Sequence, residues 1–179
     1  MRRIVLVSAA MILIAGSVLW RVFEWRESDY VRDPTLPQAP QFSLPALGGK
    51  TLTLDAIPGE LRIVYFWASW SPYARNDLGV LARIKREHGD AVTVVALCRD
   101  TNLRDARLFA ESLDLRDSVL FIFDQDDTYF KLAGGFAVPE TLFLDPGGGI
   151  LEQVHGPLAE AVLRDRITAH LKEVRDHRL

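Results

Sequence analysis

The fold is decided by the stretch F-W-A-S-W-S-P-Y-A-R at residues 66–75. It begins inside a largely apolar and β-branched run, residues 61–68, which predicts a buried central strand. A helix is predicted directly after it, over residues 72–88, with apolar side chains on one face. Ser71 is expected to cap this helix by accepting a backbone N–H, and Pro72 suits its first position. The segment therefore predicts a strand, a short loop and a helix in immediate succession.

The rest of the chain continues this alternation of strands and helices. Further strands are predicted at residues 42–44, 52–54, 91–97, 119–123, 140–144 and 150–154, and further helices at 103–113, 127–133 and from 157 onward. The order is β-β-β-α-β-α-β-α-β-β-α, in which a hairpin follows the alternating part. This order predicts an α/β fold with a mixed central sheet and helices on both of its faces.

Length and charge limit the possible classes of function. The chain has 179 residues, which suits one domain plus an appendage. Its formal net charge of −3 hides an asymmetry, because residues 1–26 carry four arginines and one glutamate. The remainder holds 17 Lys+Arg and 23 Asp+Glu, a net charge of −6. An acidic domain without a basic stripe excludes nucleic acid as a partner.

The N-terminal region has the pattern of a membrane anchor. Residues 4–20 contain no charge and follow Arg2 and Arg3, which predicts a single spanning helix within residues 1–26. A cleaved signal peptide is the alternative. Residues 27–38 are polar and rich in proline and predict a linker, and residues 39–179 are expected to form the domain. The prediction is a bacterial inner-membrane protein whose domain faces the periplasm.

Residues 66–75 resemble the active-site segment of the membrane-anchored thioredoxin-like family that includes TlpA, ResA and CcmG, F-W-A-[ST]-W-C-P-x-C-R. Two further stretches agree with this resemblance. Residues 138–145, V-P-E-T-L-F-L-D, resemble the family's cis-proline loop and the strand after it, and residues 39–44 carry its A-P-x-F-x-L phrase. The resemblance covers residues 38–174 and implies a thioredoxin-like fold. It also implies thiol–disulfide exchange, often the reduction of apocytochrome c for haem attachment.

The sequence departs from the family at the residues that carry out this exchange. Ser71 and Ala74 occupy the positions that match the family's two cysteines, and Cys98 is the only cysteine in the chain. Thiolate attack on a disulfide passes through a sulfur–sulfur bond, which a serine hydroxyl cannot form and an alanine cannot resolve. The motif therefore predicts that the redox step is lost, and no cofactor or metal is expected in its place.

Two other chemistries remain as alternatives. Cys98 closes the strand predicted at 91–97, which places it at the same sheet edge as Ser71. It is expected to be a buried structural residue, and a lone reactive thiol with Arg99 nearby is the alternative. A hydrolytic Ser71 would need an adjacent base, for which only His155, near a strand end, is a candidate.

The resemblance implies that the substrate groove survives without the sulfurs. Pro139 is expected to keep a cis peptide bond, and in thioredoxins this loop pairs with an extended substrate segment. The expected groove residues are Trp70, Ser71, Pro72, Tyr73, Val138 and Pro139. Tyr65 stands where this family commonly has an asparagine and thioredoxins a buried aspartate that assists proton transfer, which agrees with loss of the redox step.

The sequence thus predicts a membrane-anchored, redox-inactive thioredoxin-like protein. It would bind an extended segment of a partner protein as an assembly factor. The alternatives are an oxidoreductase that uses Cys98 alone and a reductase whose two cysteines were substituted. A purely structural role is the remaining possibility.

Overall fold

A five-stranded sheet forms the centre of the molecule in the computed structural model, which describes residues 35–177. The strand order is β5-β4-β3-β6-β7. The strands are β3 (Leu61–Trp67), β4 (Val92–Cys98), β5 (Leu120–Phe123), β6 (Glu140–Leu144) and β7 (Ile150–His155). β3, β4 and β5 are parallel, whereas β6 runs antiparallel to both β3 and β7. The sheet is therefore mixed, as predicted.

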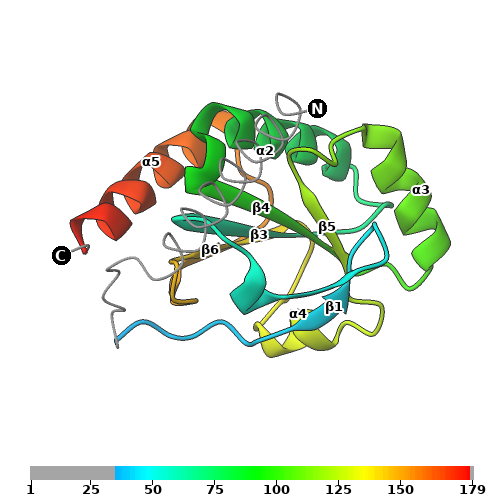
Figure 1. Cartoon of the computed structure of the whole chain (residues 1–179). Coiled ribbons are helices and arrows are strands. Elements are labelled where there is room, and N and C mark those ends of the chain that lie inside the picture. Colours follow the sequence, from blue (N-terminus) through cyan, green and yellow to red (C-terminus); the bar gives the residue numbers. More distant parts are fainter. Residues whose placement is uncertain (1–34, 178–179) are drawn as a thin grey trace, which may run out of the picture.

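The remaining elements cover both faces of this sheet. They are the helices α2 (Ala74–His88), α3 (Leu103–Leu113), α4 (Thr128–Leu132) and α5 (Glu160–Asp176), the hairpin β1 (Ser43–Pro45) and β2 (Thr51–Thr53), and the short 3-10 turns η2 (Leu54–Ala56) and η3 (Gly89–Ala91). α2, α3 and α5 lie on one side of the sheet, and α4 lies with the hairpin on the other (Figure 1). This confirms the prediction of helices on both faces.

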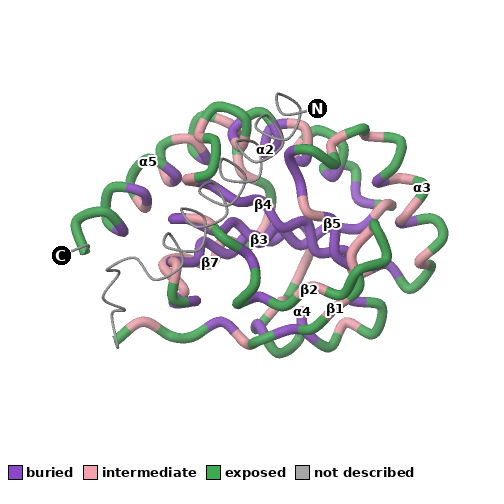
Figure 2. The backbone as a smooth tube through the Cα atoms, viewed as in Figure 1, coloured by how far each residue is buried: buried purple, intermediate pink, exposed green. Residues whose placement is uncertain are grey.

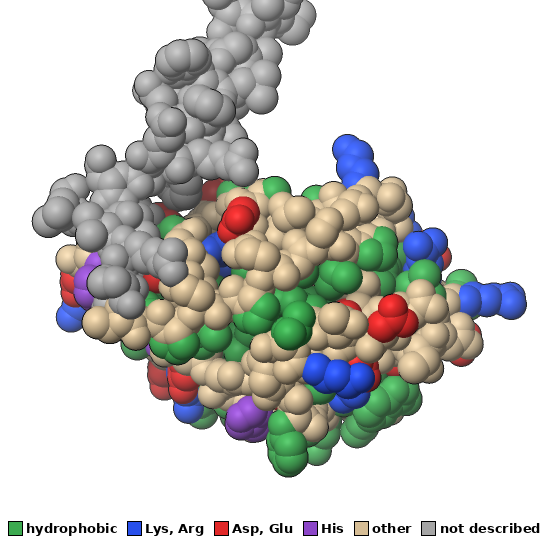
Figure 3. Space-filling model, turned by 90° about the horizontal axis from the view of Figure 1, so that it is seen from below, with side chains coloured by type: hydrophobic (Ala, Val, Ile, Leu, Met, Phe, Trp, Pro, Cys, Tyr) green, Lys and Arg blue, Asp and Glu red, His purple; other side chains and the backbone are tan. Residues whose placement is uncertain are grey.

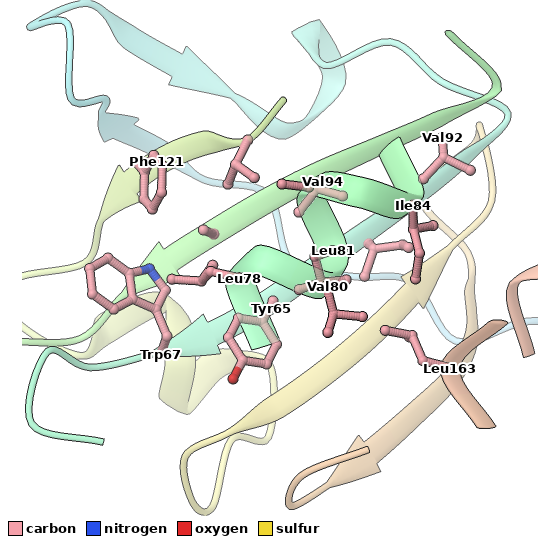
Figure 4. Close-up of a cluster of buried hydrophobic side chains, with 14 of the residues drawn as sticks. Tyr65, Trp67, Leu78, Val80, Leu81, Ile84, Val92, Val94, Phe121 and Leu163 are labelled. Atoms are coloured by element: carbon pink, nitrogen blue, oxygen red, sulfur yellow. The ribbon is translucent and has the colours of Figure 1, made fainter. Parts of the chain in front are cut away.

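The alternation of side chains along β3 divides the core into two clusters. Ile63, Tyr65 and Trp67 point toward α2, α3 and α5, while Val64 and Phe66 point toward α4 and the hairpin. Figure 4 shows the first cluster, in which Tyr65 and Trp67 lie beside Leu78 of α2. All seven residues of β3 and all seven of β4 are buried, and Figure 2 shows these strands as the buried centre. Helices packed on both faces exclude water from these strands, which explains their continuous apolar character.

The predicted strands and helices agree with the structure to within two or three residues at their ends, and one local prediction is wrong. α2 begins at Ala74, and the residue before it, Tyr73, makes no side-chain capping hydrogen bond. Ser71 lies ahead of the helix, where its carbonyl rather than its hydroxyl accepts the N–H of Ala74, at 3.2 Å. The expected Ser71 cap therefore does not form, because residues 71–73 turn before the helical hydrogen bonds start.

Residues at the end of the segment predicted as a linker, 27–38, already make backbone contacts with the domain. The N–H of Ile150 donates to the carbonyl of Pro37 at 2.8 Å, and Gln38 forms an isolated bridge with Gly149. The predicted membrane helix within residues 1–26 lies outside the described residues. Among residues 35–177, no helix combines the length and the apolar character needed to cross a bilayer.

Candidate functional site

The candidate site lies at one edge of the sheet, where β3 and β4 end and β6 begins. We call it the carboxyl edge and define it by the loops at residues 68–73, 99–102 and 134–139. The strand register brings these loops together, since Trp67 pairs with Cys98 and Phe66 pairs with Glu140. The N–H of Arg99 also donates to the carbonyl of Trp67, at 3.0 Å. Segments that are distant in the sequence therefore form one surface.

The two positions that replace the family's cysteines lie in the first of these loops (Ser71) and at the first residue of α2 (Ala74). Ser71 is 7% exposed, and its N–H donates to the carbonyl of Ala68 at 3.0 Å. Its hydroxyl is buried and has no hydrogen-bond partner within residues 35–177. Ala74 is fully buried in the first turn of α2. Neither residue offers a group that can accept or donate electrons.

The loop nevertheless presents aromatic surface to solvent. Trp70 is 68% exposed and Tyr73 is 45% exposed, whereas Trp67 is fully buried against Phe109 and Phe121. Two solvent-exposed aromatic rings within one short loop are typical of binding surfaces rather than of cores. The structure thus separates the two tryptophans near the loop into a core residue and a surface residue.

The only cysteine lies beneath this surface. The Cys98 side chain is 1% exposed, and the N–H of Asp100 donates to its sulfur at 3.5 Å. Burial raises the pKa of the Cys98 thiol well above its ordinary value, so the thiol stays protonated at neutral pH. A reactive thiol needs the opposite conditions, namely exposure and a lowered pKa.

The charged residues that follow β4 are occupied by other contacts. Arg99 makes a two-fold hydrogen bond to Asp127, with distances of 3.1 and 2.7 Å, and its guanidinium stacks over the Phe130 ring at 4.1 Å. Hydrogen bonding to Asp127 raises the pKa of Arg99. One carboxylate oxygen of Asp100 accepts the N–H of Ser69 at 2.8 Å. Arg99 therefore pairs with a carboxylate instead of stabilising a thiolate at Cys98.

The loop before β6 is organised by a buried carboxylate that the sequence analysis did not single out. The Val138–Pro139 peptide bond is cis, and the next residue, Glu140, is fully buried. One oxygen of Glu140 accepts the N–H of Phe136 at 3.0 Å, and the other accepts from the Gln153 side chain. A lone glutamate at the start of a predicted apolar strand was the available signal for this role. Glu140 holds the proline loop against β7.

His155 belongs to the same network. Its Nδ1 lies 3.3 Å from the Glu140 oxygen that accepts the Phe136 N–H, and its ring packs edge-on against Phe136 with centroids 5.9 Å apart. The Glu140 carboxylate therefore orients His155 toward the proline loop. In the described residues no hydrogen bond or ion pair joins His155 to Ser71, so a serine–histidine pair is not formed.

Tyr65 occupies the position below the start of α2. Its hydroxyl donates to Asp77 at 2.8 Å, and burial, followed by the Asp77 charge, raises the pKa of Tyr65 above its ordinary value. A cavity of about 10 Å³ adjoins the pair and is lined also by Thr141 and Leu158. That volume holds about one water molecule, which leaves no room for a substrate. Tyr65 remains a protonated structural residue.

The backbone of Val138 is the feature of this edge that most resembles a strand edge. Within residues 35–177, neither its N–H nor its carbonyl takes part in a hydrogen bond. Val138 is partly exposed, and Pro139 after it is buried. Unpaired backbone donors and acceptors at a sheet edge can pair with an added strand. Among the described residues no cluster of His, Cys, Asp and Glu has the arrangement of a metal site.

Comparison with known proteins places the chain in a family. The AhpC/TSA family profile matches residues 37–153. The chain is 34% identical over 134 residues to the thiol:disulfide interchange protein DsbE of Allochromatium vinosum, covering 72% of this chain and 71% of the relative. It is 27% identical over 173 residues to the thiol:disulfide interchange protein HelX of Rhodobacter capsulatus, covering 88% and 90%.

Solved structures agree with the sequence comparison. A Chlorobium tepidum protein assigned as a thiol:disulfide interchange protein DsbE superposes with a TM-score of 0.70 at 25% identity, covering 76% of this chain and 96% of the other. This likeness confirms the thioredoxin-like fold, and the relatives confirm the resemblance to the CcmG and ResA group. The chain therefore belongs to the AhpC/TSA family, and its relatives are thioredoxin-like thiol–disulfide oxidoreductases of the CcmG and ResA type.

Proposed function

We propose that this protein is a redox-inactive member of its family that binds an extended segment of a partner protein at the carboxyl edge. The binding groove would be formed by Trp70, Ser71, Pro72, Tyr73, Val138 and Pro139. In this proposal the protein acts as an assembly factor, held at the periplasmic face of a bacterial inner membrane by the anchor predicted within residues 1–26.

The loss of redox activity follows from the chemistry of the site. Disulfide exchange needs an attacking thiolate and a second sulfur, and Ser71 and Ala74 supply neither. Cys98 does not offer a replacement, because its thiol is buried and its pKa is raised by that burial. The family's fold is kept without the atoms that carry its chemistry.

The unpaired backbone of Val138 carries the binding half of the proposal. An extended segment that pairs with this N–H and carbonyl would lie beside the first turn of α2, because β6 pairs with β3 in the register that joins Phe66 to Glu140. The exposed rings of Trp70 and Tyr73 would then cover the segment's side chains. Main-chain pairing supplies affinity in such complexes, and side-chain contacts supply selectivity.

A disulfide-reductase assay tests the redox half. The full chain is compared with a Ser71→Cys/Ala74→Cys variant and with Cys98→Ala. We expect no activity in the full chain or in Cys98→Ala, and activity in the restored variant, because the scaffold of the family is present. Activity in the unaltered chain that disappears in Cys98→Ala would instead assign the reaction to Cys98.

Site-specific photocrosslinking in living cells tests the binding half. A photoreactive residue replaces Tyr73 at the carboxyl edge, and the matched control replaces Leu108, which is 55% exposed on α3. We expect a discrete protein adduct from position 73 and none from position 108. Equal labelling from both positions would show that the aromatic surface is not a specific binding site.

A further inference from the structure

Phe136 is the most exposed of the large apolar side chains in the described residues, with 80% of its surface accessible. It lies in the loop 134–139 of the carboxyl edge, two residues before Val138. A phenyl ring in water has no stabilising effect on the fold and favours contact with another apolar group.

The backbone that carries this ring is held in place. The N–H of Phe136 donates to the buried carboxylate of Glu140 at 3.0 Å. The preceding Gly135 donates to the carbonyl of Phe130 at 2.7 Å, and a Cβ on Gly135 would lie 2.4 Å from the Phe130 ring. Only glycine allows this approach, so the loop is held at Gly135 and at the N–H of Phe136 itself.

The ring itself is also positioned. His155 of β7 packs edge-on against it, with an angle of 85° between the ring planes and a centroid distance of 5.9 Å. His155 in turn contacts Glu140, the same carboxylate that holds the Phe136 N–H. An exposed ring whose backbone and neighbour are both restrained loses little conformational freedom when a partner covers it.

We propose that Phe136 determines which segments the groove accepts, selecting a partner segment that carries an aromatic or long aliphatic side chain. This inference rests on the proposed function, because it takes pairing at Val138 as given. Phe136 lies two residues before Val138, and a paired strand spans about 7 Å over two residues, so a segment paired with Val138 is long enough to reach Phe136. The occupant is an extended peptide, because only an extended chain can pair with the Val138 backbone.

An array of short randomised peptides, probed with the purified full chain, tests this proposal. The unaltered chain is expected to prefer peptides with Phe, Tyr, Trp, Leu or Met at one position. Phe136→Ala is expected to lose that preference and to weaken binding to the selected peptides by about tenfold, while Phe136→Trp keeps both. The matched control is Leu132→Ala, because Leu132 is 65% exposed on α4 and has no place in the groove.

The outcomes separate this inference from the proposed function. If Phe136→Ala binds the same peptides as the unaltered chain with the same residue preference, the groove binds segments but Phe136 does not select them, and the inference fails alone. If the unaltered chain binds no peptide on the array, both proposals fail. If Leu132→Ala loses the preference as well, the selection belongs to a broader apolar surface and the assignment to Phe136 is wrong.

Discussion

The two edges of the central sheet are built differently. At the edge opposite the candidate site, which we call the amino edge, Arg62 is 2% exposed and donates to the carbonyls of Leu54 at 3.0 Å and Asp145 at 2.6 Å. The carboxylate of Asp145 accepts the N–H of Gly149 at 2.7 Å. The carboxyl edge instead exposes the rings of Trp70 and Phe136. Both edges hold polar groups in internal contacts, but the carboxyl edge also presents large apolar rings to solvent.

This difference suggests that the amino edge mainly stabilises the fold, whereas the carboxyl edge is available for binding. Buried polar groups that are hydrogen-bonded internally make the amino edge costly to alter. Exposed rings and the unpaired backbone of Val138 contribute little to the free energy of folding. A partner can therefore bind them without a loss of stability in the free protein. Seen from below, the face that includes α4 and β1 shows hydrophobic side chains scattered among polar ones (Figure 3). If the edges differ in this way, substitutions at the amino edge should lower stability more than substitutions of exposed rings at the carboxyl edge.

Removal of Arg62 is expected to have the largest effect. Arg62→Ala removes two charge-assisted hydrogen bonds, to the carbonyls of Leu54 and Asp145, and leaves each carbonyl with a single backbone donor. It also opens a cavity, so the free energy of unfolding should fall by about 3–5 kcal/mol. Urea unfolding followed by circular dichroism measures this change. The control is Arg83→Ala, whose side chain is 48% exposed in a surface ion pair with Glu160, and which should cost less than about 1 kcal/mol. Equal losses of stability in the two variants would show that the Arg62 contacts stabilise the fold no more than a surface ion pair does.

Alkaline pH is expected to have an intermediate effect through Cys98. Because burial raises the pKa of this thiol, the unfolded chain loses the thiol proton first, near the ordinary value of 9.0. Stability from Cys98 is therefore complete below pH 9.0 and falls as the pH rises above it, by at most about 1.4 kcal/mol per pH unit.

The Cys98→Ala variant isolates this contribution. Its free energy of unfolding should decline less steeply than that of the unaltered chain between about pH 9 and pH 10, before tyrosines titrate in the unfolded state. In the unaltered chain, alkylation of the native thiol should be at least about 100-fold slower than in urea, because thiolate carries the reaction. Rapid alkylation of the native protein would contradict the buried placement and revive Cys98 as a reactive group.

Changes to the exposed ring at the carboxyl edge are expected to have the smallest effect on stability. Trp70→Ala should change the free energy of unfolding by less than about 0.5 kcal/mol, because 68% of the side chain is already in water. The same variant should reduce crosslinking from position 73. A loss of several kcal/mol in urea unfolding would show that Trp70 is a structural residue and that the contrast between the edges is false.

The sequence predicted some features of the carboxyl edge and missed others. The order of elements and the loop 68–73 followed from local patterns, because an apolar run and helical spacing act through neighbours a few residues apart. The roles of Glu140 and Phe136 did not follow, because they depend on contacts with Gln153 and His155 of β7. The Ser71 cap failed for a local reason, since the chain turns ahead of α2, which starts only at Ala74.

The sequence by itself determined the alternation of strands and helices and the resemblance of residues 66–75 to a redox motif. It also determined the absence of the sulfur pair at Ser71 and Ala74. Only the tertiary structure decided that Cys98 is sealed in the core, that Val138 keeps an unpaired backbone, and that Glu140 holds the proline loop. Composition and spacing are local properties, whereas burial and hydrogen-bond pairing arise when β3 and β6, distant in the chain, lie side by side.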